Sequence, residues 1–396
     1  MILSSAAQRV VASWWVLACG AGLALALVPV VRWIALRWAI VDQPGERKVH
    51  ADAKPLLGGL AVYVAFIATI SLNFVAFRYG SRVPILASHM PEIVDIATGI
   101  GAVRRELYAL MIGTSVVLVT GLLDDFYGER FPVLLKVFGQ VVAAAVLMSA
   151  GVRTTLLPDA LPWDLHNTCL TVLWIVGFTN AFNLLDNMDG LVSGVALIAS
   201  SILAFVAIQS GQFFVALILC AFSGSLLGFL HHNIHPSSIF LGDAGSLFIG
   251  YVMAALALLQ SYVTFGESSV LGALMPLIIL SLPLFDTASV VWIRLKEGRP
   301  IYMGDKCHLS HRLVELGLSQ AQAVQIVYLL TFCLGINATI LRNVTTIEGI
   351  IVALQAMGLM ALVAVLMKLG GTGEVDSPAT GDRGEPQGTR VTARCE

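Results

Sequence analysis

The most restrictive feature of this sequence is a series of eleven apolar stretches, each about as long as a helix that crosses a bilayer. They are Val11–Val31, Leu56–Phe77, Leu107–Leu123, Val133–Val152, Asn167–Leu185, Gly190–Gln209, Phe213–Leu230, Ala244–Val263, Val270–Ile293, Ala321–Leu341 and Ile347–Met367. Backbone groups inside a bilayer must bond within their own segment, so these stretches should be helices. Only 12% of the residues are charged, about half of what soluble domains carry. The sequence therefore predicts an all-α integral membrane protein with about 11 transmembrane helices.

The distribution of lysine and arginine predicts the orientation of the protein in the membrane. The loops on the side of the N-terminus hold seven of the 23, and the opposite side holds the other sixteen. By the positive-inside rule the N-terminus then lies outside and the C-terminus in the cytoplasm. Residues 1–368 form one polytopic membrane domain, and the Gly-, Pro- and acid-rich residues 369–396 form a disordered cytoplasmic tail. The net charge of -2 leaves no basic face for nucleic acid.

The polar residues gather in five of the loops between the apolar stretches. In chain order these are Asp42–His50 with Pro55–Gly59, Asp124–Asp125, Asn183–Gly190, His231–Ser246 and Asp305–Leu313. All five loops are odd-numbered, so all lie on the predicted cytoplasmic side. One hydrophilic turn at a membrane surface needs no special explanation, but five on the same side do. We therefore expect a single active site formed by these cytoplasmic loops.

Five aspartates in these loops exceed the lysines and arginines that are placed to neutralise them. They are Asp124, Asp125, Asp186, Asp189 and Asp243. Like charges brought together raise each other's pKa unless a cation lies among them, and oxygen donors without a soft ligand suit Mg²⁺ or Mn²⁺ better than zinc. Mg²⁺ is commonly held by one or two carboxylates and substrate phosphates, so the pattern indicates a diphosphate substrate. Asp124–Asp125 taken alone also fits an ordinary helix-end loop.

The ninth loop carries side chains that can bind phosphate. His308, His311 and Arg312 lie close together, and Arg294 is among the cations that precede them. Imidazole and guanidinium groups can bind a phosphate together, and the arginine can make two bonds to it. The alternative is a loop whose positive charge only anchors the topology. Asp286, inside the ninth stretch, fits a structural carboxylate or a site residue, and we expect Arg294 or a polar neighbour as its partner.

Asn183–Gly190 resembles the N-x-x-D-x-x-D-G segment of the polyprenyl-phosphate N-acetylhexosamine-1-phosphate transferases, which belong to glycosyltransferase family 4. The D-D pair, the N-x-x-P of Asn233–Pro236 and the segment F-L-G-D-A-G-S match in the same order. D-x-P-x-x-R-K-x-H and D-K-x-H-L-x-H-R-L resemble the bacterial branch that uses UDP-N-acetylglucosamine, and the H-H-H-F segment of the muramoyl-pentapeptide transferases is missing. Asn187 stands in place of a common Gly, which bears on the geometry of the turn, and Ser310 stands in place of a common His, which leaves the identity of the sugar open.

The resemblance implies a Mg²⁺-dependent enzyme (or a Mn²⁺-dependent one) of the bacterial cytoplasmic membrane. Such an enzyme transfers an N-acetylhexosamine 1-phosphate, in the first place GlcNAc 1-phosphate, from a UDP-sugar to undecaprenyl phosphate and releases UMP. The lipid product would start a cell-envelope polysaccharide. The resemblance assigns catalysis to Asp124, Asp125, Asp186 and Asp189, and the metal to Asp243 and Asp186. It assigns substrate binding to Arg47, Lys48, His50, Asn183, Asn233, Arg294, His308, His311 and Arg312.

Several alternatives stay open at this point. Direct attack by the lipid phosphate and a covalent phospho-enzyme both fit the residues, and so do a monomer and a homodimer. A phospho-MurNAc-pentapeptide transferase-like enzyme would share most of the motifs. A polytopic transporter would place ionisable residues near mid-membrane, often in broken helices of paired repeats. Only Asp286 is clearly intramembrane and the sequence has no internal repeat, so the enzyme is favoured.

Overall fold

The computed structural model describes residues 5–42, 54–83, 103–154, 165–260, 274–300, 307–341 and 346–370. The helices in these ranges are α1 (Ser5–Arg37), α2 (Gly58–Gly80), α5 (Arg104–Tyr127), α6 (Val133–Ser149), α7 (Leu165–Leu185), α8 (Leu191–Gln209), α9 (Phe213–Asn233), α10 (Gly242–Leu259), α11 (Met275–Ile279), α12 (Ser281–Lys296), α13 (Leu309–Glu315), α14 (Gln320–Ile340) and α15 (Thr346–Gly370). A single 3₁₀ turn, η1 (Gly128–Arg130), follows α5. Two short strands, β1 (Val41–Asp42) and β2 (Lys54–Pro55), pair antiparallel.

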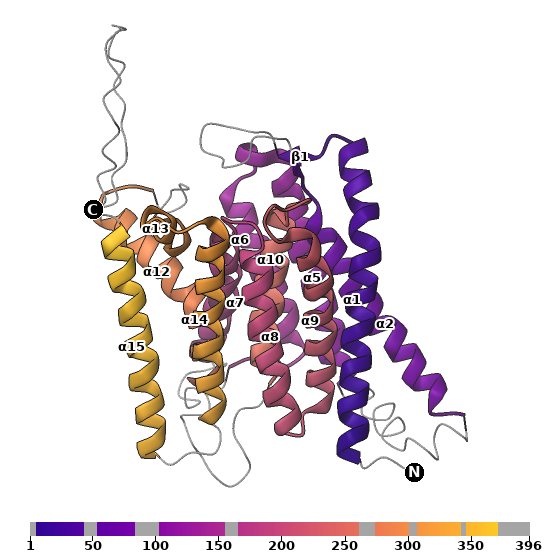
Figure 1. Cartoon of the computed structure of the whole chain (residues 1–396). Coiled ribbons are helices and arrows are strands. Elements are labelled where there is room, and N and C mark those ends of the chain that lie inside the picture. Colours follow the sequence, from indigo (N-terminus) through magenta and orange to yellow (C-terminus); the bar gives the residue numbers. More distant parts are fainter. Residues whose placement is uncertain are drawn as a thin grey trace, which may run out of the picture.

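The long helices form one bundle, with the strand pair and α13 at the same end of it (Figure 1). Nine of the described helices are long and apolar enough to cross a membrane, and α6 is a shorter apolar helix. All eleven predicted stretches contain helix, which confirms the all-α membrane fold. The count by length is lower because α6 has only 17 residues and because the ninth stretch is divided into α11 and α12. Helix α15 continues to Gly370, and the predicted tail beyond it lies outside the described residues.

Proline explains the division of the ninth stretch. A proline has no N–H to donate, and its ring clashes with the carbonyl four residues before it. For Pro283 that carbonyl belongs to Ile279, the last residue of α11. Leu280 lies between the two helices, with φ -100 and ψ 13. Helix α12 therefore begins anew inside the bundle, and it carries Asp286 and Arg294, which are both buried.

Exposed tryptophans indicate where α1 meets the two membrane surfaces. Trp14 and Trp15 lie near its start, and Trp33 and Trp38 lie near or just past its end, each at least 60% exposed. Trp15 and Trp33 are 18 residues apart, which is about 27 Å along a helix and close to the thickness of a bilayer core. Because tryptophan favours the headgroup level, the strand pair that follows α1 lies near one membrane surface. The start of α1 and the end of α15 lie at opposite ends of the bundle (Figure 1).

Helix α10 is packed in the interior of the bundle, between α5, α7 and α2. Two glycines let neighbouring backbones approach its first turn closely. A Cβ on Gly59 would collide with the backbone of Gly245, and one on Gly121 would lie 2.7 Å from the carbonyl oxygen of Asp243. The N–H groups of Gly58 and Gly59 donate to the carbonyls of Phe240 and Leu241 at 2.9 and 2.8 Å. These contacts fix the start of α10, and therefore the backbone that carries Asp243.

Candidate active site

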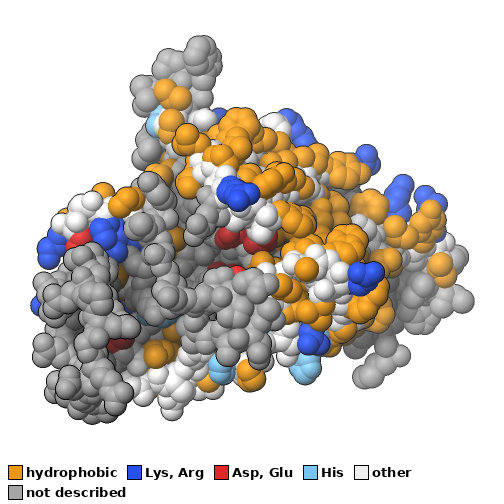
Figure 2. Space-filling model, turned by 90° about the horizontal axis from the view of Figure 1, so that it is seen from above, with side chains coloured by type: hydrophobic (Ala, Val, Ile, Leu, Met, Phe, Trp, Pro, Cys, Tyr) orange, Lys and Arg blue, Asp and Glu red, His pale blue; other side chains and the backbone are white. Residues whose placement is uncertain are grey.

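Acidic side chains gather in a hollow near the middle of the face that carries the polar loops (Figure 2). Residues from all five loops are joined by hydrogen bonds at this end of the bundle. The joining pairs are Lys54–Asp189, Lys54–Ser237, Asp125–Asp243 and Ser310–Asn187. Loops far apart in the sequence therefore meet in one place, as a shared site requires.

Asp125 holds the start of α10. Its two carboxylate oxygens accept the backbone N–H groups of Asp243 at 2.7 Å and Ala244 at 3.0 Å. The first N–H groups of a helix have no partner within the helix, and Leu241, the residue before α10, gives no side-chain cap. A carboxylate from α5 thus caps α10, and the positive end of the α10 dipole favours its negative charge.

Lys136 lies among the acidic groups at the start of α6. Its ammonium group contacts the carboxylate of Asp124 and lies 3.7 Å from Asp243. It also donates to Asn183 Oδ1 at 3.5 Å, while Asn183 Nδ2 donates to Asp243 and, at 2.9 Å, to Ser246 Oγ. Four helices, α5, α6, α7 and α10, therefore bring one cation and two carboxylates into direct contact.

Asp186 follows the end of α7 and faces the same negative charges. Burial, and then the charges of Asp243, Asp125 and Asp189, raise the pKa of Asp186 well above its ordinary value. A group in this position gains from a nearby cation, and its oxygen donors suit Mg²⁺ or Mn²⁺ in kind. Within the described ranges, no three acidic, histidine or cysteine side chains are arranged to hold one metal ion. The residues therefore fit an ion held by one or two carboxylates and completed by water or phosphate.

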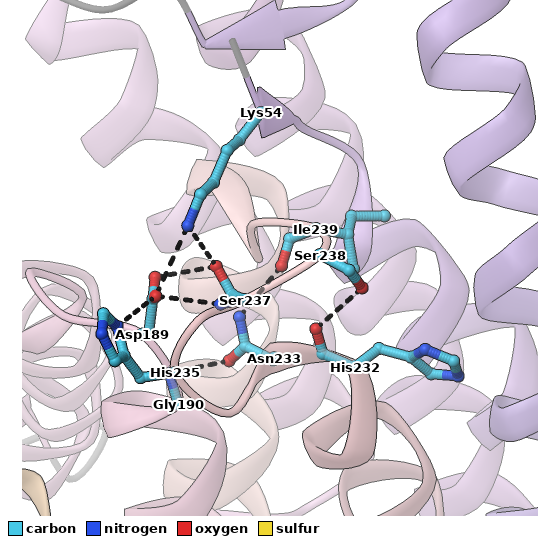
Figure 3. A network of polar contacts seen from close by, with 9 residues as sticks. All are labelled: Lys54, Asp189, Gly190, His232, Asn233, His235, Ser237, Ser238 and Ile239. Carbon is cyan, nitrogen blue, oxygen red and sulfur yellow. Dashed lines mark hydrogen bonds and ion pairs between the residues drawn. The ribbon is translucent and has the colours of Figure 1, made fainter. Parts of the chain in front are cut away.

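Asp189 belongs to a separate network, in which other residues of the protein supply hydrogen-bond donors to its carboxylate (Figure 3). It accepts the backbone N–H of Ser237 at 3.0 Å and the Ser237 hydroxyl at 2.8 Å, and it lies 2.9 Å from His235 Nδ1 and 3.5 Å from Lys54 Nζ. Burial alone would raise the pKa of Asp189, but these hydrogen bonds and the charge of Lys54 hold it below its ordinary value. Lys54 also lies over the ring of Phe240, 4.9 Å from its centroid.

Asn233 connects the end of α9 to the turn before α8. Its Oδ1 accepts the Gly190 N–H at 3.1 Å and the Ser193 hydroxyl at 2.9 Å, and its Nδ2 donates to the Ile239 carbonyl at 3.1 Å. Gly190 has φ 77, in the left-handed region that glycine adopts most readily. Asn233 was predicted to bind substrate, and its amide makes these three bonds within the protein.

The ninth loop is attached to α12. The carboxylate of Asp286 pairs with His308 Nδ1 at 2.7 Å and accepts the Leu309 N–H at 2.7 Å, and both side chains are buried. We expected Arg294 or a polar neighbour as the partner of Asp286, and His308 is such a polar partner. Arg294 and Arg312 are also buried, and His311 lies on α13 beside Arg312.

Arg47, Lys48 and His50 were predicted to bind substrate, and they lie outside the described residues. Lys54 and Lys136 contact the acidic residues but were not predicted. The sequence shows only that each of these lysines lies close to a polar loop. A lysine at that place also fits a residue that anchors the orientation of the protein in the membrane.

The sequence model of glycosyl transferase family 4 matches residues 107–261. A "Probable undecaprenyl-phosphate N-acetylglucosaminyl 1-phosphate transferase" of Bacillus subtilis is 34% identical over 81% of this chain and 82% of its own length. The chain belongs to glycosyl transferase family 4. A "Decaprenyl-phosphate N-acetylglucosaminephosphotransferase" of Mycolicibacterium smegmatis is 30% identical, over 76% of this chain and 74% of its own. An "Undecaprenyl-phosphate alpha-N-acetylglucosaminyl 1-phosphate transferase" of Yersinia pestis is 27% identical, over 83% of this chain and 85% of its own.

The family model matches most of α5 and the whole of α6 to α10. The match therefore includes Asp124, Asp125, Asp186 and Asp243, together with Lys136. The ninth loop and α13 lie outside the matched residues. The hydrogen bond from Ser310 to Asn187 is what connects them to the acidic residues.

Proposed function

We propose that this chain transfers GlcNAc 1-phosphate, or that of a related N-acetylhexosamine, from a UDP-sugar to undecaprenyl phosphate. An oxygen of the lipid phosphate forms a bond to the sugar-bearing phosphorus, and the bond from that phosphorus to the bridging oxygen breaks. UMP leaves with that oxygen, and the undecaprenyl-diphospho-sugar is the product. The names of the relatives support the reaction class. We further propose that the product starts a cell-envelope polysaccharide in the bacterial cytoplasmic membrane, with the polar loops in the cytoplasm.

The observation that carries this proposal is the cluster of Lys136, Asp124 and Asp243 at one end of a membrane bundle. A lipid phosphate and a nucleotide diphosphate are both anionic, so the reaction needs charge neutralisation and alignment above all. The Lys136 ammonium can bind the lipid phosphate where it enters from the membrane surface. The carboxylates would repel these substrates without a cation, and Mg²⁺, bound by Asp243 and Asp186, would supply that charge and polarise the diphosphate.

Within the aspartate pair, the geometry supports different roles for the two residues. Both oxygens of Asp125 accept backbone N–H groups of α10, so Asp125 positions Asp243. Among the described residues Asp124 makes no such backbone contact, and it lies against Lys136. Asp124 is therefore the member of the pair that would take a proton from the lipid phosphate. Asn183 orients Asp243 and Lys136 by its hydrogen bonds.

A transporter is less well supported. Its substrate path would use the intramembrane Asp286, but both oxygens of that carboxylate are bonded to His308 and Leu309. Such a residue fastens the ninth loop to α12 and does not line a path.

The test is transfer of labelled sugar phosphate by purified protein. We expect labelled UDP-GlcNAc and undecaprenyl phosphate to yield labelled lipid and one UMP per product, with activity lost in EDTA and restored by Mg²⁺. Asp243→Asn should lower kcat by orders of magnitude and weaken the response to Mg²⁺. The absence of transfer from every UDP-N-acetylhexosamine would overturn the proposal, and transfer unaffected by EDTA would overturn its metal.

A further inference from the structure

Asn187, the residue after Asp186, uses only one of its two amide atoms. Its Oδ1 accepts the hydroxyl of Ser310 at 2.7 Å. Its Nδ2 is buried and has no hydrogen-bond partner in the part of the chain that the structure describes. A buried donor without a partner is costly, and such groups in native proteins are few. A hydrogen-bond acceptor that binds at this position would remove the cost.

Ser310 is held firmly, so its hydrogen bond fixes the position of the Asn187 amide group. The Ser310 side chain is buried on α13. The first turn of α13 is fastened to α12 through the bonds of His308 and Leu309 to Asp286. Turning the Asn187 amide by 180° would let Nδ2 donate to Ser310 Oγ, but Oδ1 would then lose its partner, so in either orientation one amide atom is left for a ligand.

The position of Asn187 favours one of the two substrates. The cation that suits the lipid phosphate, Lys136, contacts Asn183 at the α7 end of the turn. Asn187 lies four residues further along and contacts the ninth loop instead. The nucleotide sugar is the substrate that offers uncharged carbonyl and hydroxyl oxygens as acceptors for an amide N–H.

We propose that Asn187 determines specificity for the donor substrate: its Nδ2 donates to an uncharged oxygen of the nucleotide sugar, and Ser310 is the positioning residue that orients it. This inference rests on the proposed function and names a residue pair for donor recognition.

The test is a double-mutant cycle with steady-state kinetics. Asn187→Ala should raise KM for the UDP-sugar about tenfold, the loss expected for one neutral hydrogen bond, and leave kcat and KM for undecaprenyl phosphate unchanged. Ser310→Ala should raise the same KM by a smaller factor, and the double variant should match Asn187→Ala alone. The preference between UDP-GlcNAc and UDP-GalNAc should change in both single variants.

Two further variants make the result decisive. Asn187→Leu keeps a similar side-chain volume and lacks the donor without adding a charge, so it should raise KM even if Asn187→Ala folds poorly. Ser200→Ala removes a buried hydroxyl bond of similar length, 2.8 Å to Ser223, far from the turn, and should leave KM unchanged. An active wild-type enzyme with unchanged KM in Asn187→Leu and Asn187→Ala would overturn the inference. A wild-type enzyme inactive with every UDP-sugar would overturn the proposed function instead.

Discussion

Gly121→Ala should inactivate the protein although it changes no polar group. Gly121 lies on α5 one turn before Asp125, and it packs directly on the first turn of α10. A Cβ at this position would lie 2.7 Å from the backbone nitrogen of Ala244 and 2.7 Å from the carbonyl oxygen of Asp243, whereas ordinary contact begins at 3.4 Å. Both neighbours are backbone atoms, so no side chain can rotate away.

The size of the effect follows from these distances. The two helices must separate by about 1 Å to restore ordinary contact, and packed interiors do not yield without cost. Such a shift lengthens the bonds from Asp243 and Ala244 to Asp125, now 2.7 and 3.0 Å, to about the limit of a hydrogen bond or beyond it. Overpacking costs about 1–3 kcal/mol of stability, and a misplacement of about 1 Å at a catalytic group can cost about 100-fold in rate.

The assay compares Gly121→Ala with a glycine that has free space. A Cβ on Gly177 of α7 would meet nothing within 4 Å, so Gly177→Ala should keep full activity and gain up to about 1 kcal/mol from helix propensity. We expect sugar-phosphate transfer to fall about 100-fold in Gly121→Ala only, with a lower unfolding temperature in detergent. Equal activity in the two variants would refute the claim that this backbone contact positions Asp243.

Three further predictions follow from individual contacts. Lys136→Met should lower kcat/KM for the lipid phosphate about 10- to 100-fold, the loss of a charge-assisted bond, and measurement against lipid concentration checks it. Asp189→Asn should cost about 2 kcal/mol of stability at neutral pH. Because the folded-state pKa of Asp189 is lowered, this contribution is present above about pH 4 and is lost as the pH falls further. The unfolding temperatures of wild type and variant should therefore converge in acid. Tyr328→Phe removes the hydroxyl that donates to the Gly190 carbonyl at 2.5 Å and should lower activity, whereas Tyr251→Phe, which loses a bond to the Ala143 carbonyl at 3.3 Å, should affect stability only.

The membrane fold could be predicted because it depends on the length and polarity of single segments. The backbone N–H and C=O groups of each apolar stretch must form hydrogen bonds within that stretch, whatever its neighbours are. The break at Leu280 was missed although Pro283 is visible in the sequence, because neighbouring helices often let a proline continue a membrane helix. The meeting of the polar loops at one end of the bundle could also be predicted. All of them are odd-numbered, and the side on which a loop lies depends only on the number of membrane crossings before it.

The individual contacts in the site could not be predicted, because they depend on how helices pack. Lys136 looks like an ordinary lysine near the start of an apolar stretch, and such side chains often reach the membrane surface. Only the packing of α6 between α5 and α7 brings it to Asp124 and Asn183. The partner of Asp286 lies 22 residues further along the chain, and no local pattern connects two such positions.

The acidic cluster raises the question of what holds like charges together at a membrane surface. One lysine contacts Asp124 and Asp243, so ion pairing balances only part of the charge. The rest of the support is backbone: the N–H groups of α10 on Asp125, and the close approach of α5 to α10 that Gly121 permits. Helix packing therefore supplies the free energy that charge repulsion removes, and a bound cation and phosphate would relieve that repulsion. If the proposed metal-bound diphosphate binds here, relief of the same repulsion would contribute to its affinity.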